Sequence, residues 1–456
     1  MHTTVTDFSE TTLEMGTVCF PEPQSRASSD QDRTIATSTK KRRIHRPMHK
    51  LESSSDIVRG FSPAWFTATM GTGITGILVF NFPYHWEPLR YIGMAIALFN
   101  LLLYILFAVL FAWRLIWYRD FYSILLHPQM SMSLGTIPMG LCTIVISLVV
   151  MITPYGAPWV PTLGLVLWCI CVVLSVLSYL VIPFTAITHQ QHLLDKMNAT
   201  LLLPVVTTVV AASTGAVVCS VHNIGSAATV IIFISYILWA MGVGLSLMII
   251  TIYLVRLTMF KLPPKEAIVS VFIPLGPFGQ SSYGIQMLGA ESLRVLPSAL
   301  PHISYLGEVL YSTGFFLGLL IWSFAIWWFF HASYSIIYTR FRGKLPFNLG
   351  WWALIFPIGT FASSSSALWT ITGYTVFRVL NAILNALILL LWVLVMANTI
   401  RYAWTGELLK PASIGQLELK HKSSDLSDDN QDSVADIEEG RVPDEMYEHQ
   451  NQRQLA

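Results

Sequence analysis

Charged residues are scarce in this chain of 456 residues, whereas hydrophobic residues make up 54% of it. Only 12% of the residues are Asp, Glu, Lys or Arg, and these gather in the two ends of the chain and in short loops. This composition excludes an ordinary soluble core and indicates a membrane protein. The formal net charge of +1 gives no sign of nucleic-acid binding.

Cysteine is also scarce, and the five cysteines follow no metal-binding or disulfide spacing. Cys169 and Cys171 fall in an apolar segment, where small buried cysteines are ordinary. No H-E-x-x-H signature and no nucleophile–base–orienter set is visible in the sequence. We therefore expect neither a metal nor another cofactor, and we do not expect an enzyme.

Apolar segments of about 20 residues or more recur along the chain and predict an all-α polytopic membrane protein. The predicted transmembrane spans are 61–82, 91–118, 131–153, 162–183, 199–219, 228–256, 267–290, 307–338, 350–372 and 375–400. They form a predicted ten-helix transmembrane domain over residues 56–405. Residues 1–55 are polar and contain the basic run 40–46, and residues 406–456 are polar and acidic, so both are predicted to be disordered tails. Residues 1–55 have no apolar core near the start, so we expect no cleavable signal peptide.

The odd-numbered spans share one design, in which a proline is followed by glycine, serine and threonine. The prolines are separated by 75, 66, 73 and 80 residues, a period that fits one helical hairpin per repeat. A proline interrupts helical hydrogen bonding, and a bilayer tolerates such a break only beside protein or a watery cavity. We expect the proline-bearing helices to be kinked and to lie inside a shell of plain apolar helices.

No Asp, Glu, Lys or Arg occurs within the five proline-bearing spans as predicted. This argues against a proton-driven carrier with a buried carboxylate and against a cation pore ringed by acids. Hydroxyls and the ends of broken helices remain, and these can hold an anion loosely. The predicted pore-lining and helix-break residues are Pro63, Gly71, Gly73, Pro138, Gly140, Thr143, Pro204, Thr207, Thr208, Pro277, Gly279, Gln280, Ser281, Ser282, Pro357, Gly359, Ser363 and Ser364.

A simpler explanation exists for each of these residues taken alone. A single hydroxyl can merely satisfy the backbone at a kink. Gly71, Gly73 and Gly76 match G-x-G-x-x-G, but the βαβ context of a nucleotide site is missing. Close helix packing and pore lining are both open for these glycines.

Phe356 is the one large aromatic residue among those that precede the five prolines. If five helices surround one axis, a single ring can block the passage by its size and by dewetting. Phe356 is therefore the predicted pore gate. The alternative is an ordinary packed phenylalanine.

Lysine and arginine in the short loops predict the orientation of the chain. Nine of them follow the even-numbered spans, among them Arg340, Arg342 and Lys344, whereas the opposite loops hold Arg90 and Arg294. Both termini should therefore be cytoplasmic. Arg340, Arg342 and Lys344 form the predicted cytoplasmic mouth, where they would raise the local anion concentration. The glycosylation sequon at Asn198 should then be cytoplasmic and unused.

Four segments resemble a known family. They are Ile137-Pro-Met-Gly-Leu141, Leu275-Gly-Pro-Phe-Gly-Gln280, Tyr283-Gly284 and Phe356-Pro-Ile-Gly-Thr360. They are similar to the tellurite-resistance/dicarboxylate transporter family, which includes slow anion channels and malic-acid permeases. The fungal sulfite efflux branch is the nearest match. The resemblance covers about residues 60–405, in order and with the right spacing.

The resemblance implies ten transmembrane helices, arranged as five helical hairpins around a quasi-fivefold central pore. It also implies a homotrimer with one pore per subunit and a gating phenylalanine in the ninth helix, where Phe356 fits better than Phe361 because it directly precedes the proline. The expected function is efflux of sulfite or bisulfite across the plasma membrane, giving sulfite tolerance. A malate or other small-anion permease, and a membrane sensor without flux, remain as alternatives.

Overall fold

Every regular element that the structure describes is a helix. This computed structural model covers residues 58, 60–84, 86–221, 227–405 and 408. The all-α class predicted from the apolar segments is confirmed for this part of the chain. The predicted tails lie outside the described residues, apart from position 408.

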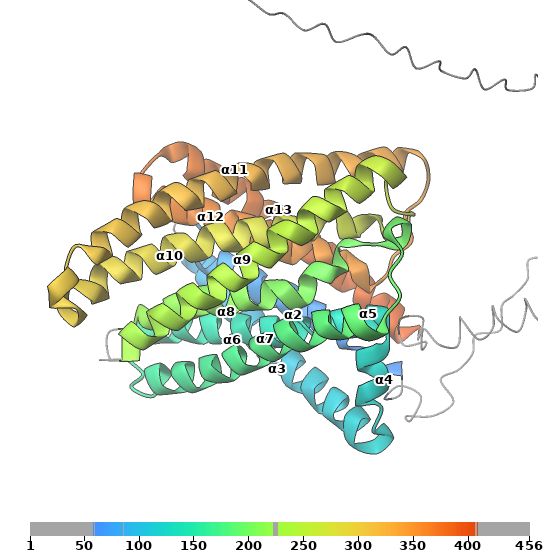
Figure 1. Cartoon of the computed structure of the whole chain (residues 1–456), viewed down its shortest axis with the longest axis horizontal. Helices are drawn as coiled ribbons and strands as arrows, with labels where there is room; N and C mark the ends of the chain where they lie inside the picture. The colour runs from blue at the N-terminus through green and yellow to red at the C-terminus, as the bar shows by residue number, and fades with distance from the viewer. Residues whose placement is uncertain (1–57, 59, 85, 222–226, 406–407, 409–456) are drawn as a thin grey trace, which may run out of the picture. The chain divides into compact units, whose positions relative to one another are not determined.

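The long helices contact each other two by two along the chain (Figure 1). The contacting pairs are α2 (Phe66–Phe80) with α3 (Glu87–Tyr118), α6 (Thr136–Ile152) with α7 (Val160–His189), α8 (Leu203–Cys219) with α9 (Ala227–Phe260), α10 (Leu275–Ala299) with α11 (Leu306–Phe341), and α12 (Ile355–Thr372) with α13 (Thr375–Trp404). Short elements lie in the connections: α4 (Phe121–Leu126), α5 (Pro128–Ser133), η2 (Thr153–Tyr155), η3 (Leu194–Lys196) and η6 (Pro301–Ile303).

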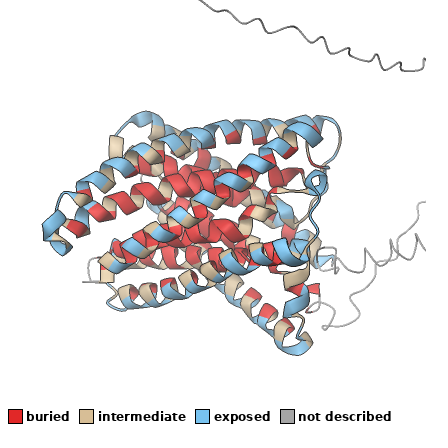
Figure 2. Ribbon diagram, viewed as in Figure 1, coloured by how far each residue is buried: buried red, intermediate tan, exposed pale blue. Residues whose placement is uncertain are grey.

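The helices divide into an inner and an outer set. The inner helices are α2, α6, α8, α10 and α12, and they contact one another in a closed cycle, because α12 also contacts α2. The most apolar stretch of the segment Pro63–Phe80 is 89% buried, whereas that of α11 is 17% buried. Figure 2 shows the same division, with buried residues concentrated on α8 and α10 and exposed residues on α9 and α11.

Nine helical segments in the described ranges are long and apolar enough to cross a membrane. The helix α10 is not among them, although the sequence predicted a span at 267–290. It continues to Ala299 and therefore carries Glu291 and Arg294. The two side chains form an ion pair at 2.7 Å, and Glu291 is 8% exposed. The predicted span 267–290 holds no charged residue, but α10 extends beyond it, and near its C-terminal end the ion pair with Arg294 offsets the cost of burying Glu291.

The five repeated prolines do not kink the middle of a helix. Pro63 lies in a 3-10 turn, and the other four lie within the first three residues of α6, α8, α10 and α12. The missing N–H of proline costs little there, because the first turn of a helix leaves its N–H groups without helical partners. The breaks are instead the 3-10 turns that precede four of the inner helices: η1 (Pro63–Trp65), η4 (Ala199–Leu202), η5 (Ile268–Phe272) and η7 (Leu349–Leu354).

Each outer helix donates a side-chain hydrogen bond to the next inner helix. Four of the donors are tryptophan indoles, and the fifth is an asparagine amide. The bonds are Asn100 to Thr143 Oγ1 (3.4 Å), Trp168 to the Ala211 carbonyl oxygen (2.9 Å), Trp239 to the Ser281 carbonyl oxygen (2.9 Å), Trp322 to Ser365 Oγ (2.9 Å) and Trp392 to Thr72 Oγ1 (3.1 Å). The last bond joins α13 to α2 and so links the end of the helical part to its beginning.

Candidate functional site

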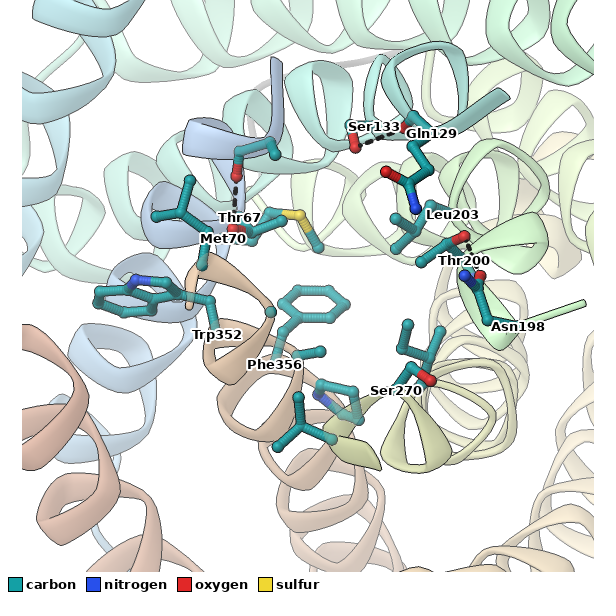
Figure 3. A pocket seen from close by; sticks show the side chains of 18 of the residues that line it. Thr67, Met70, Gln129, Ser133, Asn198, Thr200, Leu203, Ser270, Trp352 and Phe356 are labelled. Atoms are coloured by element: carbon teal, nitrogen blue, oxygen red, sulfur yellow. Dashed lines mark hydrogen bonds between the residues drawn. The ribbon is translucent and has the colours of Figure 1, made fainter. Parts of the chain in front are cut away.

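A cavity of about 420 Å³ lies at the end of the molecule where the inner helices begin. Residues from the first turns of all five inner helices line it, together with residues of the short turns before them. Figure 3 shows Thr67 and Met70 on one side, Leu203 and Asn198 on the other, and the ring of Phe356 between them. The N-terminal end of a helix carries a partial positive charge. Five such ends surround this cavity, so its electrostatics favour an anion without any buried cation.

Phe356 lies at the second residue of α12 and points into the cavity (Figure 3). Its side chain is 5% exposed. Phe361 takes a different place, because its ring packs against Trp322 and Phe329 of α11, with centroid distances of 5.9 and 5.8 Å. It does not contribute to the described cavity lining. Of the two candidate phenylalanines, Phe356 is therefore the one that lines the cavity.

Helix-capping side chains supply part of the polar lining. Ser62, Asn198 and Asn348 each accept a hydrogen bond from the backbone N–H two residues later, at 3.3, 3.0 and 2.8 Å. All three line the cavity. The sequence prediction missed this role, although an asparagine or serine directly before an apolar segment is a helix-start signal. For Asn198 the sequence pattern indicates a glycosylation sequon, and the structure adds the capping role.

Glu266 is the one charged residue in the lining of this cavity. Its side chain is exposed, and its carbonyl oxygen accepts a hydrogen bond of 2.8 Å from Asn348 Nδ2.

The predicted mouth residues Arg340, Arg342 and Lys344 are exposed and do not line the cavity. They lie at the same end of the molecule, since Lys265 Nζ donates to the Arg342 carbonyl oxygen at 3.2 Å. The Arg342 guanidinium lies over the ring of Tyr338 at 4.4 Å.

The cavity brings together Phe356, Pro357 and Pro277 from the predicted set. The predicted glycines lie at helix contacts instead. A Cβ atom on Gly71 would stand 2.7 Å from the Trp352 ring, and one on Gly279 would stand 2.6 Å from the backbone nitrogen of Phe361. A Cβ atom would likewise lie too close to the side chain of Thr143 if built on Gly73, of Thr69 if built on Gly140, and of Ile74 if built on Gly359. These glycines let neighbouring inner helices approach closely.

Most of the predicted hydroxyls donate to backbone carbonyl oxygens. Thr143, Thr207, Thr208 and Ser364 donate to the carbonyl oxygen three residues earlier, at 2.7 to 3.1 Å. Ser282 donates across to Gly318 of α11 at 2.7 Å. Gln280 donates to Ser213 Oγ on α8. Ser281 and Ser363 are buried, at 3% and 8% exposure.

Comparison with known protein families matches residues 60–400 to the family described as voltage-dependent anion channel. This range contains every inner and outer helix apart from the last residues of α13. The chain belongs to the voltage-dependent anion channel family. The cavity at the five inner-helix N-terminal ends therefore lies within the matched part of the chain, and its electrostatics agree with an anion channel family.

Curated proteins that are similar to this chain carry transport names. The chain is 35% identical over 354 residues to proteins named sulfite efflux pump from Arthroderma otae and from Arthroderma benhamiae. Each alignment covers 77% of this chain and 93% of the relative. A more distant relative is named malic acid transport protein, from Schizosaccharomyces pombe. It is 22% identical, and the alignment covers 78% of this chain and 82% of that protein.

Proposed function

We propose that this protein is an efflux transporter or channel for sulfite or bisulfite and that it gives sulfite tolerance. The observation that carries an anion as the substrate is the convergence of five inner-helix N-termini on one cavity. The substrate class rests on the relatives, because the sulfite efflux pumps match at 35% identity over nearly their whole length. Since these relatives have transport names, we expect no catalysis.

The proposed architecture is ten transmembrane helices in five hairpins around a quasi-fivefold pore. The closed cycle of inner-helix contacts and the five bonds from outer to inner helices support it. Within this proposal α10 spans the membrane in addition to the nine apolar segments, and its ion pair lies near the outer surface. We further propose a homotrimer with one pore per subunit, in the plasma membrane, with cytoplasmic tails at 1–55 and 406–456.

The proposed mechanism is passive or weakly coupled permeation through a pathway that contains no fixed cation. The anion enters the cavity from the cytoplasm, attracted by Arg340, Arg342 and Lys344 at the mouth. The Phe356 ring then obstructs the way past the first turn of α12. When the ring moves aside, the anion continues between the inner helices along the predicted lining residues. A neutral pathway binds the anion weakly enough to release it.

A malate permease of the same family is the second candidate. Two carboxylates favour a fixed cation near the pathway, and the cavity lining offers Glu266 as its one charged side chain. The relative named for malic acid transport is also more distant, at 22% identity. A sensor without flux is the candidate from another class, and no described feature favours it.

Sulfite efflux from fungal cells that lack their own pump tests the proposed function. Cells that carry this chain should release sulfite faster and tolerate more of it than cells with an empty vector. A surface-localised protein that restores neither efflux nor tolerance would contradict the proposal. Malate and chloride fluxes measured in the same cells would then decide between the remaining anions.

A further inference from the structure

The inner-helix side chains differ in whether they keep a hydrogen atom for a ligand. A hydroxyl has one hydrogen to donate, and a glutamine amide has two. A hydroxyl that already donates to a carbonyl oxygen presents only its lone pairs, and these repel an anion. The position of each donor hydrogen therefore decides which predicted lining residues can contact a passing anion.

Five of the predicted hydroxyls have no hydrogen left. Thr143, Thr207, Thr208, Ser282 and Ser364 all donate to backbone carbonyl oxygens, at 2.7 to 3.1 Å. Three of these residues lie on α6 and α8, so these two helices contribute no predicted hydroxyl that is ready to bind an anion. These bonds stabilise the helices and do not solvate a ligand.

Three of the predicted lining residues keep a hydrogen. Among the described residues, the Oγ atoms of Ser281 and Ser363 have no hydrogen-bond partner, although both residues are buried. Gln280 is 3% exposed and donates one amide hydrogen to Ser213 Oγ, which leaves the second. Ser213 in turn donates to the Val210 carbonyl oxygen at 2.9 Å, so it stays an acceptor for the glutamine.

The three residues lie on helix faces that continue from the cavity. Ser363 follows Phe356 by seven residues, which places it on the same face of α12, about 10.5 Å further along the axis. Gln280 and Ser281 follow Pro277 by three and four residues, one turn further along α10. The two helices are neighbours, because Thr360 Oγ1 donates to the Gly276 carbonyl oxygen at 3.3 Å.

We propose that Gln280, Ser281 and Ser363 form an anion-contacting station that follows the Phe356 gate. The station would bind a small oxyanion such as bisulfite or sulfite, by donating hydrogen bonds that replace the water lost on passing the gate. This inference rests on the proposed function and adds to it the residues that would recognise the substrate. It restricts recognition to one side of the pathway, formed by α10 and α12.

The test uses purified protein in liposomes, with Phe356→Ala added throughout so that the gate does not limit flux. Ser281→Ala and Ser363→Ala should each raise the sulfite concentration for half-maximal flux, by about 10- to 100-fold for one lost hydrogen bond to a charged ligand. Ser147→Ala is the matched control. Its hydroxyl is buried on α6 and donates to the Thr143 carbonyl oxygen at 2.8 Å. It should change the half-maximal concentration less than twofold.

Gln280 needs a second comparison, because its substitution can disturb packing between α8 and α10. Gln280→Leu removes both amide hydrogens, whereas Ser213→Ala removes only the partner and frees an amide hydrogen. The station predicts weaker sulfite binding in Gln280→Leu and unchanged or tighter binding in Ser213→Ala. If both variants weaken binding equally and lower the melting temperature equally, the pair serves packing and the inference fails.

The outcomes separate the two proposals. If Phe356→Ala alone carries no sulfite, the proposed function and the station both fail. If it carries sulfite and the variants Ser281→Ala, Ser363→Ala and Ser147→Ala behave alike, the function stands and the station is overturned.

Discussion

At the scale of single residues, Phe356 carries the clearest prediction. Its ring points into the cavity where five helix ends meet, and its side chain is 5% exposed. Phe356→Ala should therefore increase anion flux, because the steric and dewetting barrier is removed while the inner helices remain in contact. Sulfite flux through reconstituted protein measures the effect, and we expect an increase of at least tenfold, equivalent to about 1.4 kcal/mol of barrier.

Phe361→Ala provides the comparison for this gate. The Phe361 ring packs between α12 and α11, so its loss should lower stability by about 3 kcal/mol and should not open the pathway. Equal gains in flux for the two variants would show that loosened packing, and not an open gate, increases permeation. A well-folded Phe356→Ala protein with unchanged or lower flux would contradict the gate directly.

The candidate site was predictable where one residue type stood out against its repeats. Phe356 did so, because the residues at the equivalent positions of the other repeats are not large aromatics. Which hydroxyls are free to donate could not be predicted, since Ser363 and Ser364 look alike in the sequence. The structure shows that the Ser364 hydroxyl donates to a backbone carbonyl oxygen, whereas the Ser363 hydroxyl does not. Asn348 could have been recognised as a helix cap, whereas Glu266 entered the lining through the packing of η5 against η7, which no local pattern indicates.

At the scale of helices, close approach of α10 and α12 depends on Gly279. A Cβ atom there would lie 2.6 Å from the Phe361 nitrogen and 2.7 Å from the Thr360 carbonyl carbon, both backbone atoms that cannot turn away. Gly279→Ala should therefore destabilise the protein by about 1 to 3 kcal/mol, as overpacking does. The melting temperature of the purified protein in detergent measures this change.

Gly244 on the outer helix α9 is the matched control, because no atom lies within 4 Å of a Cβ built there. Gly244→Ala should leave the melting temperature unchanged or raise it, since alanine favours a helix more than glycine does. A similar loss of stability in both variants would mean that helix approach at Gly279 is not limiting.

Helix α10 shows that a hydropathy pattern does not always locate the end of a helix. The predicted span at 267–290 ended where Glu291 begins a charged turn, but α10 continues for another two turns because Arg294 pairs with Glu291 and also donates to the Cys219 carbonyl oxygen. The repeated prolines do identify the inner helices, because all five lie in or directly before them. Their position in the first turn was missed, because a proline signals a break without saying on which side of it the helix lies.

At the scale of the whole molecule, three features from distant parts of the sequence lie together at the end where the inner helices begin. The inner-helix N-termini surround the cavity there, the caps Ser62, Asn198 and Asn348 line it, and the basic connections that contain Lys265 and Arg342 reach it. We propose from the positive-inside rule that this end faces the cytoplasm. An efflux pathway then presents its anion-attracting cavity to the compartment from which the substrate leaves.

Cysteine labelling tests this orientation. Gln129 lines the cavity and is exposed, whereas Tyr374 is 68% exposed at the opposite ends of α12 and α13. In a background with Cys19→Ser and Cys169→Ser, a membrane-impermeant maleimide should label Tyr374→Cys on intact cells. It should label Gln129→Cys only after the cells are permeabilised, because the lipid bilayer separates the two ends. The reverse pattern would place the cavity outside, where five positive helix ends would attract anions toward uptake, and it would contradict the proposed direction of transport even if sulfite permeates.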